Sequence, residues 1–232
     1  NSEPPTSLRV SGSELDTINF SQFAKVDLDY RFYKKLSSKH NIATRINIGI
    51  ARPFGFTSDV PYVKQFFVGG PTSIRAWAAR ELGPGGYDDP ALDEINNPLF
   101  FYQTGDLKLE FNFEYRFDLF WSLKGALFLD GGNVWTLDCD PTRLGSQFLL
   151  RSGTPSCATN GNETFVNEAF YQQIALGSGF GLRLDFAYFI LRLDMGLRVR
   201  NPFREPTTNR YWVSPSESFQ NINFNLGLGY PF

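Results

Sequence analysis

The stretch DLKLEFNFEYRF, residues 106–117, decides the fold class of this chain. Apolar residues occupy every second position from Leu107 to Phe117, and charged or amide side chains occupy the positions between them. Alternation with a period of two residues, sustained over about 10 residues, is typical of a β-strand that has one apolar and one polar face. We therefore predict a long amphipathic strand at residues 106–117.

The same alternation recurs on both sides of this strand. It predicts six further strands at residues 23–32, 46–50, 123–135, 174–186, 189–199 and 222–232, and a partial strand around residues 8–15. A soluble β-sandwich also alternates. Here, however, the apolar positions are uniformly large, and the polar positions combine Arg, Asp, Glu, Asn and Gly, as the inner wall of a barrel requires. We therefore predict an all-β fold, a transmembrane antiparallel up-and-down β-barrel with seven to eight strands in this chain.

Composition agrees with a barrel and excludes other classes. Aromatic residues make up 16% of the chain, and transmembrane barrels collect aromatic side chains at both membrane interfaces. No run of about 18 apolar residues occurs, which excludes a transmembrane helix. The net charge is −2 with both signs mixed along the chain, whereas a nucleic-acid-binding protein usually clusters its basic residues. No nucleic-acid partner is expected.

The connections between the predicted strands alternate in length. Barrels of the outer membrane have short periplasmic turns and longer extracellular loops. The long connections are residues 52–105, 136–173 and 201–218, and the short ones are 35–41, 118–122 and 187–188. The long loops are therefore expected outside the cell, and the chain is expected to end at Phe232 in the periplasm.

The two cysteines, Cys139 and Cys157, both lie in the predicted extracellular loop 136–173. In an oxidising compartment they are expected to form a disulfide, which would contribute about 3 kcal/mol by the chain-entropy model. Two unpaired thiols are the alternative that the sequence leaves open.

One segment of the first long loop carries a family resemblance. The stretch QFFVGGPTSIRAW, residues 65–77, followed by ELGPG at 81–85, resembles the signature of the inward-folding extracellular loop of the BamA/TamA family. The loop-motif residues are Gly69, Gly70, Ile74, Arg75, Ala76 and Trp77. Ala76 and Trp77 depart from the glycine and the Phe or Tyr that the family usually has at these two positions, so the turn after the arginine is expected to differ in shape.

Two later segments, residues 105–117 and 128–135, resemble the strands that follow this loop in the family. The resemblance implies that residues 1–232 form the C-terminal half of a 16-strand barrel domain, with loop 52–105 folded into the lumen. It also implies that Arg75 pairs there with Glu110 and Asp130. The alternation independently puts both carboxylates on the lumen face. A general ladder of lumen charges that includes Arg116 and Lys124 is the alternative.

The last residues, NLGLGYPF at 225–232, resemble the C-terminal signal of outer-membrane barrels. The positions that carry this resemblance are Asn225, Gly227, Tyr230 and Phe232. Glycines weaken strand pairing and Pro231 cannot donate a hydrogen bond to a neighbouring strand. A weakly paired last strand is what a lateral seam would use, while simple strand termination with aromatic anchoring is the alternative.

The resemblance implies a non-enzymatic factor of the bacterial outer membrane that helps insert or translocate other outer-membrane proteins. Its expected partners are outer-membrane lipids, unfolded outer-membrane proteins, and accessory lipoproteins or upstream periplasmic domains. A polypeptide-secretion transporter of the same fold and a passive porin or structural barrel are the alternatives. An outer-membrane phospholipase is disfavoured because His40 is the one histidine, and no metal or cofactor is expected.

Overall fold

The computed structural model describes residues 21–88, 103–155, 157, 166–186, 188–205 and 208–232. In these residues, seven strands form one antiparallel sheet in the order of the sequence. They are β1 (Phe23–Lys35), β2 (His40–Pro53), β3 (Leu107–Phe120), β4 (Leu123–Trp135), β5 (Ala175–Phe186), β6 (Phe189–Arg200) and β7 (Asn223–Leu228). The all-β class and the up-and-down order are confirmed. The partial strand predicted around residues 8–15 lies outside the described residues.

The described parts of the long connections contain three short helices: η1 (Tyr62–Lys64), η4 (Phe170–Gln173) and α1 (Pro215–Gln220). Helix α1 begins after a capping residue: the Ser214 hydroxyl accepts a hydrogen bond from the Glu217 amide, and Pro215 occupies the first helical position. None of the helices in the described part of the chain has the length and apolar character needed to span a bilayer.

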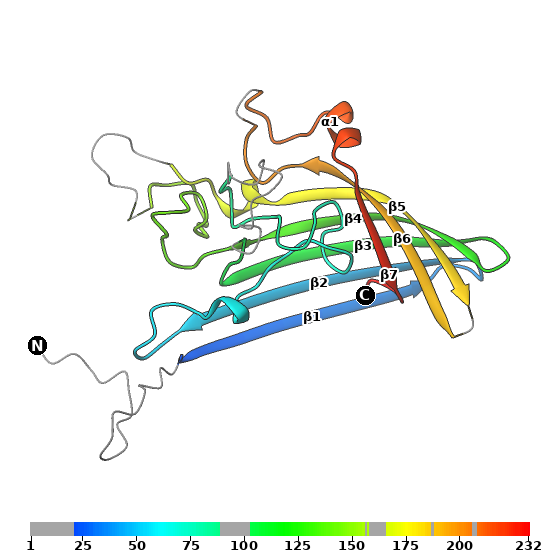
Figure 1. Ribbon diagram of the computed structural model, residues 1–232, viewed down its shortest axis with the longest axis horizontal. Coiled ribbons are helices and arrows are strands. Elements are labelled where there is room, and N and C mark those ends of the chain that lie inside the picture. Colours follow the sequence, from blue (N-terminus) through cyan, green and yellow to red (C-terminus); the bar gives the residue numbers. More distant parts are fainter. Residues whose placement is uncertain (1–20, 89–102, 156, 158–165, 187, 206–207) are drawn as a thin grey trace, which may run out of the picture.

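The sheet curls, and the loop after β2 lies inside the curl (Figure 1). The turns between β1 and β2, β3 and β4, and β5 and β6 gather at one end of the sheet, and the long loops gather at the other. β7 crosses in front of the other strands in this view, and side chains of β7 touch the loop after β2. We call the concave side, which holds the loop, the lumen.

The two faces of the sheet have the opposite distribution of side chains from that of a water-soluble protein. On the convex face, Val26, Leu28 and Tyr30 of β1 are 52%, 63% and 65% exposed. On the lumen face, Asn112 and Asp130 are fully buried. A sheet that exposes large apolar side chains in unbroken rows and buries its charges is suited to a surrounding of lipid.

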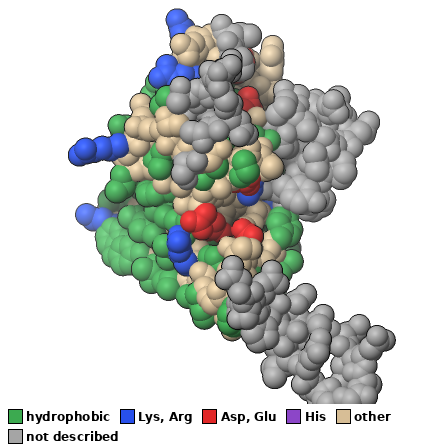
Figure 2. Space-filling view, turned by 90° about the vertical axis from the view of Figure 1, so that its left-hand side faces the viewer, with side chains coloured by type: hydrophobic (Ala, Val, Ile, Leu, Met, Phe, Trp, Pro, Cys, Tyr) green, Lys and Arg blue, Asp and Glu red, His purple; other side chains and the backbone are tan. Residues whose placement is uncertain are grey.

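A view from the end that carries the long loops shows the same separation (Figure 2). Hydrophobic side chains cover the surface on one side of the molecule, and acidic side chains lie near the middle of the view. Many of the large apolar side chains are therefore on the outer surface, as the exposed positions of β1 are.

The last strand is shorter than predicted. The alternation predicts a strand at residues 222–232, but β7 ends at Leu228. Gly229 adopts a φ of +82° and turns the chain away from β6, and Pro231 has no amide hydrogen to continue the pairing. After this turn, Phe232 is directed into the lumen, where it is only 6% exposed. The periplasmic position of the chain end stays a prediction.

A lumen loop and the last strand as the candidate functional site

The loop motif turns back on itself at a pair of glycines. Gly69 and Gly70 have φ values of +96° and +87°, which favour glycine. A Cβ atom on Gly69 would lie 2.1 Å from the carbonyl oxygen of Ala78, so no larger residue fits without movement. The Gly70 amide donates to the Trp77 carbonyl at 2.8 Å and closes the turn. The two glycines of the motif therefore set the shape of residues 69–77.

Apolar residues of the motif form the described chain's main apolar cluster, which lies inside the lumen. Ile74 and Ala76 are fully buried and Trp77 is 3% exposed. They pack with residues of the loop itself and of β2, β4 and β5, which are Ala51, Val60, Phe66, Val68, Leu82, Val134 and Ala175. At Gly177 of β5, an added Cβ would lie 2.5 Å from the Cβ of Ala76. Ala76, which replaces the usual glycine of the family, thus packs against Gly177, where the strand has no side chain.

Arg75 is buried at the centre of this site and its side chain is fully paired. Its Nε and Nη2 atoms donate to the two carboxylate oxygens of Asp130 at 2.8 and 2.9 Å. Its Nη1 atom donates to Glu114 at 2.5 Å. The guanidinium carbon lies 3.6 Å from the centre of the Phe128 ring. Bidentate pairing and stacking on a ring hold a guanidinium in one orientation.

The structure corrects one member of the predicted triad. Arg75 is bonded to Asp130 and Glu114, whereas Glu110 is paired with Arg45 at 2.9 Å. Glu110 and Glu114 both face the lumen, on either side of Asn112, which lies opposite Asp130 in the register. Alternation cannot distinguish between them. The Arg75 guanidinium stacks on Phe128, which lies opposite Glu114 in the register of β3 and β4. This stacking brings the guanidinium within reach of Glu114.

Side chains from three strands bind the backbone of the motif. The Arg45 side chain donates to the Thr72 carbonyl at 3.0 Å, and the Asn112 amide donates to the Ser73 carbonyl at 2.8 Å. The Arg75 carbonyl accepts hydrogen bonds from Asn223 and Asn225 of β7, both at 2.9 Å. Sequence reasoning placed these strand residues on the lumen face but did not identify them as partners of the loop.

The Arg75 pairs belong to a larger buried network of charges. Glu114 also accepts from Arg116 at 2.7 Å and lies 3.0 Å from Arg183 of β5. Asp194 of β6 lies 2.8 Å from Arg183 and 3.2 Å from Arg192. Removing one member of such a network leaves its partners charged and uncompensated, which is costly away from water. The network joins β3, β5 and β6 on the lumen side.

The residues of the predicted C-terminal signal lie beside this network. Asn225 faces the lumen, and an added Cβ on Gly227 would lie 2.6 Å from the Arg192 side chain. Arg116 lies 4.3 Å from the centre of the Tyr230 ring and donates to the Phe232 carbonyl oxygen at 3.3 Å. The last residues are thus held against the same arginine that pairs with Glu114.

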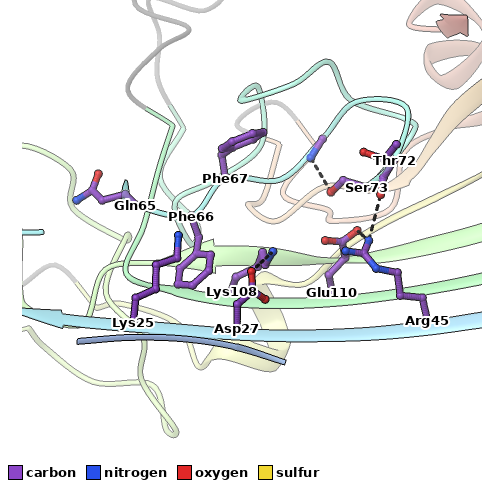
Figure 3. A pocket seen from close by; sticks show the side chains of 11 residues that line it. Lys25, Asp27, Arg45, Gln65, Phe66, Phe67, Thr72, Ser73, Lys108 and Glu110 are labelled. Carbon is purple, nitrogen blue, oxygen red and sulfur yellow. Dashed lines mark hydrogen bonds and ion pairs between the residues drawn. The ribbon is translucent and has the colours of Figure 1, made fainter. Parts of the chain in front are cut away.

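A cavity of about 240 Å³ lies between the loop after β2 and the strands β1, β2 and β3. Figure 3 shows Phe66, Phe67, Thr72 and Ser73 of the loop facing polar side chains of these strands. Lys25 and Lys108 approach the Phe66 ring at 3.9 and 5.2 Å. The loop therefore contacts this wall mainly through charged and polar groups.

A second long loop, residues 136–173, covers the first. Cys139 and Cys157, which the sequence predicts to be bonded, form a disulfide in it. The Gly86 amide donates to the Gly145 carbonyl at 3.0 Å and connects the two loops. Partial burial raises the pKa of Asp140, but hydrogen bonds from Thr142 and Arg143 outweigh burial and lower that pKa below its usual value.

Comparison with known proteins agrees with this architecture. The family model of the Omp85 superfamily domain matches residues 16–232. The fold is similar to the crystal structure of BamA from Haemophilus ducreyi lacking POTRA domains 1–3, with a TM-score of 0.57 and 16% sequence identity. That match covers 90% of this chain and 35% of the other, so the chain spans about a third of the BamA structure. No curated protein matches in sequence. The chain belongs to the Omp85 superfamily.

Proposed function

We propose that this chain acts as part of a non-enzymatic factor that inserts other β-barrel proteins into the bacterial outer membrane. In this proposal, the loop after β2 that carries residues 65–77, here called the lumen loop, stabilises the barrel from inside. The last strand provides one side of a weak seam through which client strands enter the bilayer. An exposed strand edge is a template for pairing with another chain.

The observation that carries this proposal is the position of the loop motif between two walls of the curled sheet. Asp130 and Glu114 hold Arg75 on one side, and Asn223 and Asn225 hold it on the other. β7 itself pairs with β6 over only six residues, from Asn223 to Leu228. Among the described residues, no strand pairs with the other edge of β7. A well-anchored loop next to a short strand with a free edge supports an assembly function.

The filled lumen argues against a passive pore. Arg75, Glu114, Arg183 and Asp194 occupy the lumen side of the sheet with no exposed side-chain surface. A water-filled channel would leave such side chains hydrated. A polypeptide-secretion transporter of the same family remains the second candidate, because it could use the same barrel to pass one dedicated client.

We further propose that residues 1–232 are the C-terminal part of a larger, 16-strand barrel in the outer membrane. The free edges of β1 and β7 in the described residues and the partial coverage of the matched BamA structure support this arrangement. The proposed partners are outer-membrane lipids on the apolar convex face, unfolded outer-membrane proteins at the seam, and accessory lipoproteins or periplasmic domains.

Substitution of Arg75 by Ala tests the proposal in the full-length protein. The variant leaves Glu114 and Asp130 buried with fewer partners and releases the loop, so folded barrel and client assembly should both decrease. Both are measured by heat-modifiable gel mobility, and Arg151→Ala, at an exposed loop position, is the matched control. Normal assembly of clients and unchanged mobility in Arg75→Ala would contradict the assignment. A defect confined to one secreted protein would favour the transporter.

A further inference from the structure

One residue of the loop is bonded to strands that are not neighbours in the sheet. The backbone amide and the guanidinium of Arg75 bind Asp130 of β4. The carbonyl oxygen of the same residue accepts from Asn223 and Asn225 of β7. β5 and β6 separate β4 from β7 in the sheet. Arg75 therefore links β4 directly to β7, whereas the path through the sheet runs across β5 and β6.

The contact between the Arg75 carbonyl and β7 is made by two lumen-facing residues, which are two positions apart on that strand. Asn223 and Asn225 both face the lumen, and Asn225 is 6% exposed. Gly196 of β6 lets the loop come close, since an added Cβ there would lie 2.4 Å from the Arg75 carbonyl oxygen. The third lumen position of β7 is Gly227, which has no side chain. The two asparagines therefore provide the contacts of β7 with the loop.

The residues of β7 itself have few other restraints, and the chain after β7 is held by Arg116 through Tyr230 and Phe232. Its outward side chains Phe224, Leu226 and Leu228 are 66%, 69% and 74% exposed. Its only strand partner among the described residues is β6, over six positions. Two hydrogen bonds from side chains to one carbonyl are therefore a large share of what fixes the position of this strand.

We propose that Asn223 and Asn225 are positioning residues that couple the lumen loop to the last strand. When Arg75 is released from Asp130, β7 loses part of its support, and when β7 moves, the loop loses two hydrogen bonds. Such coupling between two sites is reciprocal by thermodynamic necessity. The role at a seam rests on the proposed function, under which a client strand that displaces β7 would also loosen the loop.

Hydrogen–deuterium exchange on the folded full-length protein in lipid nanodiscs tests the coupling. Asp130→Asn weakens the guanidinium pair without touching β7. We expect it to speed amide exchange in residues 223–228 about tenfold, the effect of losing roughly one ordinary hydrogen bond. In the background of Asn223→Ala with Asn225→Ala, the exchange of β7 should already be fast, and Asp130→Asn should add little.

Asn221→Ala is the matched control, because the Asn221 side chain donates to the Glu217 carbonyl and not to the loop. In that background, Asp130→Asn should still speed exchange in β7. Asn225→Asp, which removes the donor with little change in size, replaces the double variant if that variant fails to fold. Equal effects of Asp130→Asn with and without the asparagines, or no effect on β7 at all, would overturn the coupling.

The two proposals fail in different ways. If the exchange measurements show coupling but client assembly is normal in all variants, the coupling stands and the assembly function does not. If assembly is defective in Asp130→Asn while β7 exchanges at the same rate as before, the function stands and the coupling is wrong.

Discussion

Glu114 is a carboxylate that three arginines share in the lumen. It lies within 3.0 Å of Arg75, Arg116 and Arg183, and its side chain is fully buried. Glu110, two lumen-facing positions earlier on β3, pairs with Arg45, which also contacts Asp29 at 3.1 Å. Loss of Glu110 therefore leaves Arg45 with Asp29. Loss of Glu114 removes the carboxylate that pairs with Arg116, and it also takes one of the partners from Arg75 and from Arg183.

We therefore expect Glu114→Gln to destabilise the barrel by about 3 kcal/mol, the usual cost of leaving buried charge unpaired. The matched variant Glu110→Gln should have a clearly smaller effect. The folded fraction of each, followed by gel mobility across a urea titration, checks this order. A larger loss in Glu110→Gln would mean that the triad predicted from the sequence is the more important one.

At this scale, the sequence predicted the correct face but not the correct contact. Alternation placed Glu110, Asp130 and both asparagines of β7 on the lumen side. It could not choose between Glu110 and Glu114, because both positions share that face and flank Asn112. The choice depends on where the Arg75 side chain stacks, and stacking on Phe128 is a tertiary contact.

At the scale of elements, the loop 136–173 is held in place by hydrogen bonds to other segments as well as by its own disulfide. The bond joins Cys139 and Cys157 across 18 positions, while the Gly145 carbonyl separately accepts from Gly86 and from Gln173. These backbone contacts should hold part of the loop in place when the bond is absent. Both cysteines lie outside the strands of the barrel.

Cys139→Ser with Cys157→Ser should therefore loosen the loop and leave the barrel folded. By the chain-entropy argument, closing a loop of this length is worth about 3 kcal/mol. We expect faster proteolysis between residues 140 and 155 in intact cells, with unchanged heat-modifiable mobility. Loss of the folded barrel in this variant would show that the bond supports the strands as well.

Strand ends were predicted unevenly. β4 has the predicted bounds of 123–135, because its alternation stops at the loop. The prediction for β7 ran on to Phe232, since glycine and proline happen to occupy positions that fit the alternation. The conformation of Gly229 and the missing amide hydrogen of Pro231 decide where pairing stops, and alternation takes account of neither.

For the whole molecule, the apolar convex face is the feature that predicts a lipid environment. Leu129 of β4 is 40% exposed on this face although its strand is paired on both sides. Leu129→Arg should lower the stability of the folded barrel in a bilayer by about 2–4 kcal/mol if it lies near the midplane. Leu150→Arg, at a loop position that is 71% exposed, should have little effect. Equal stability of both variants in lipid vesicles would argue against lipid at this face.

The global arrangement was partly predictable. Strand number, order and faces follow from a local pattern, and the loop motif was identified by its resemblance to a family. The contact of the loop with β7 joins residues 148 and 150 positions apart. A local pattern contains no information on such a pair, so the position of the loop between two walls required the folded structure.

A photo-reactive residue in place of Leu226 on β7 tests most directly whether clients enter at this strand. In growing cells, the full-length protein should crosslink from this position to several different, newly made outer-membrane proteins. The same residue at Leu127 of β4, an outward position on a strand with partners on both sides, should give no such products. Crosslinks to a single secreted protein, or equal products from both positions, would contradict an assembly seam at β7.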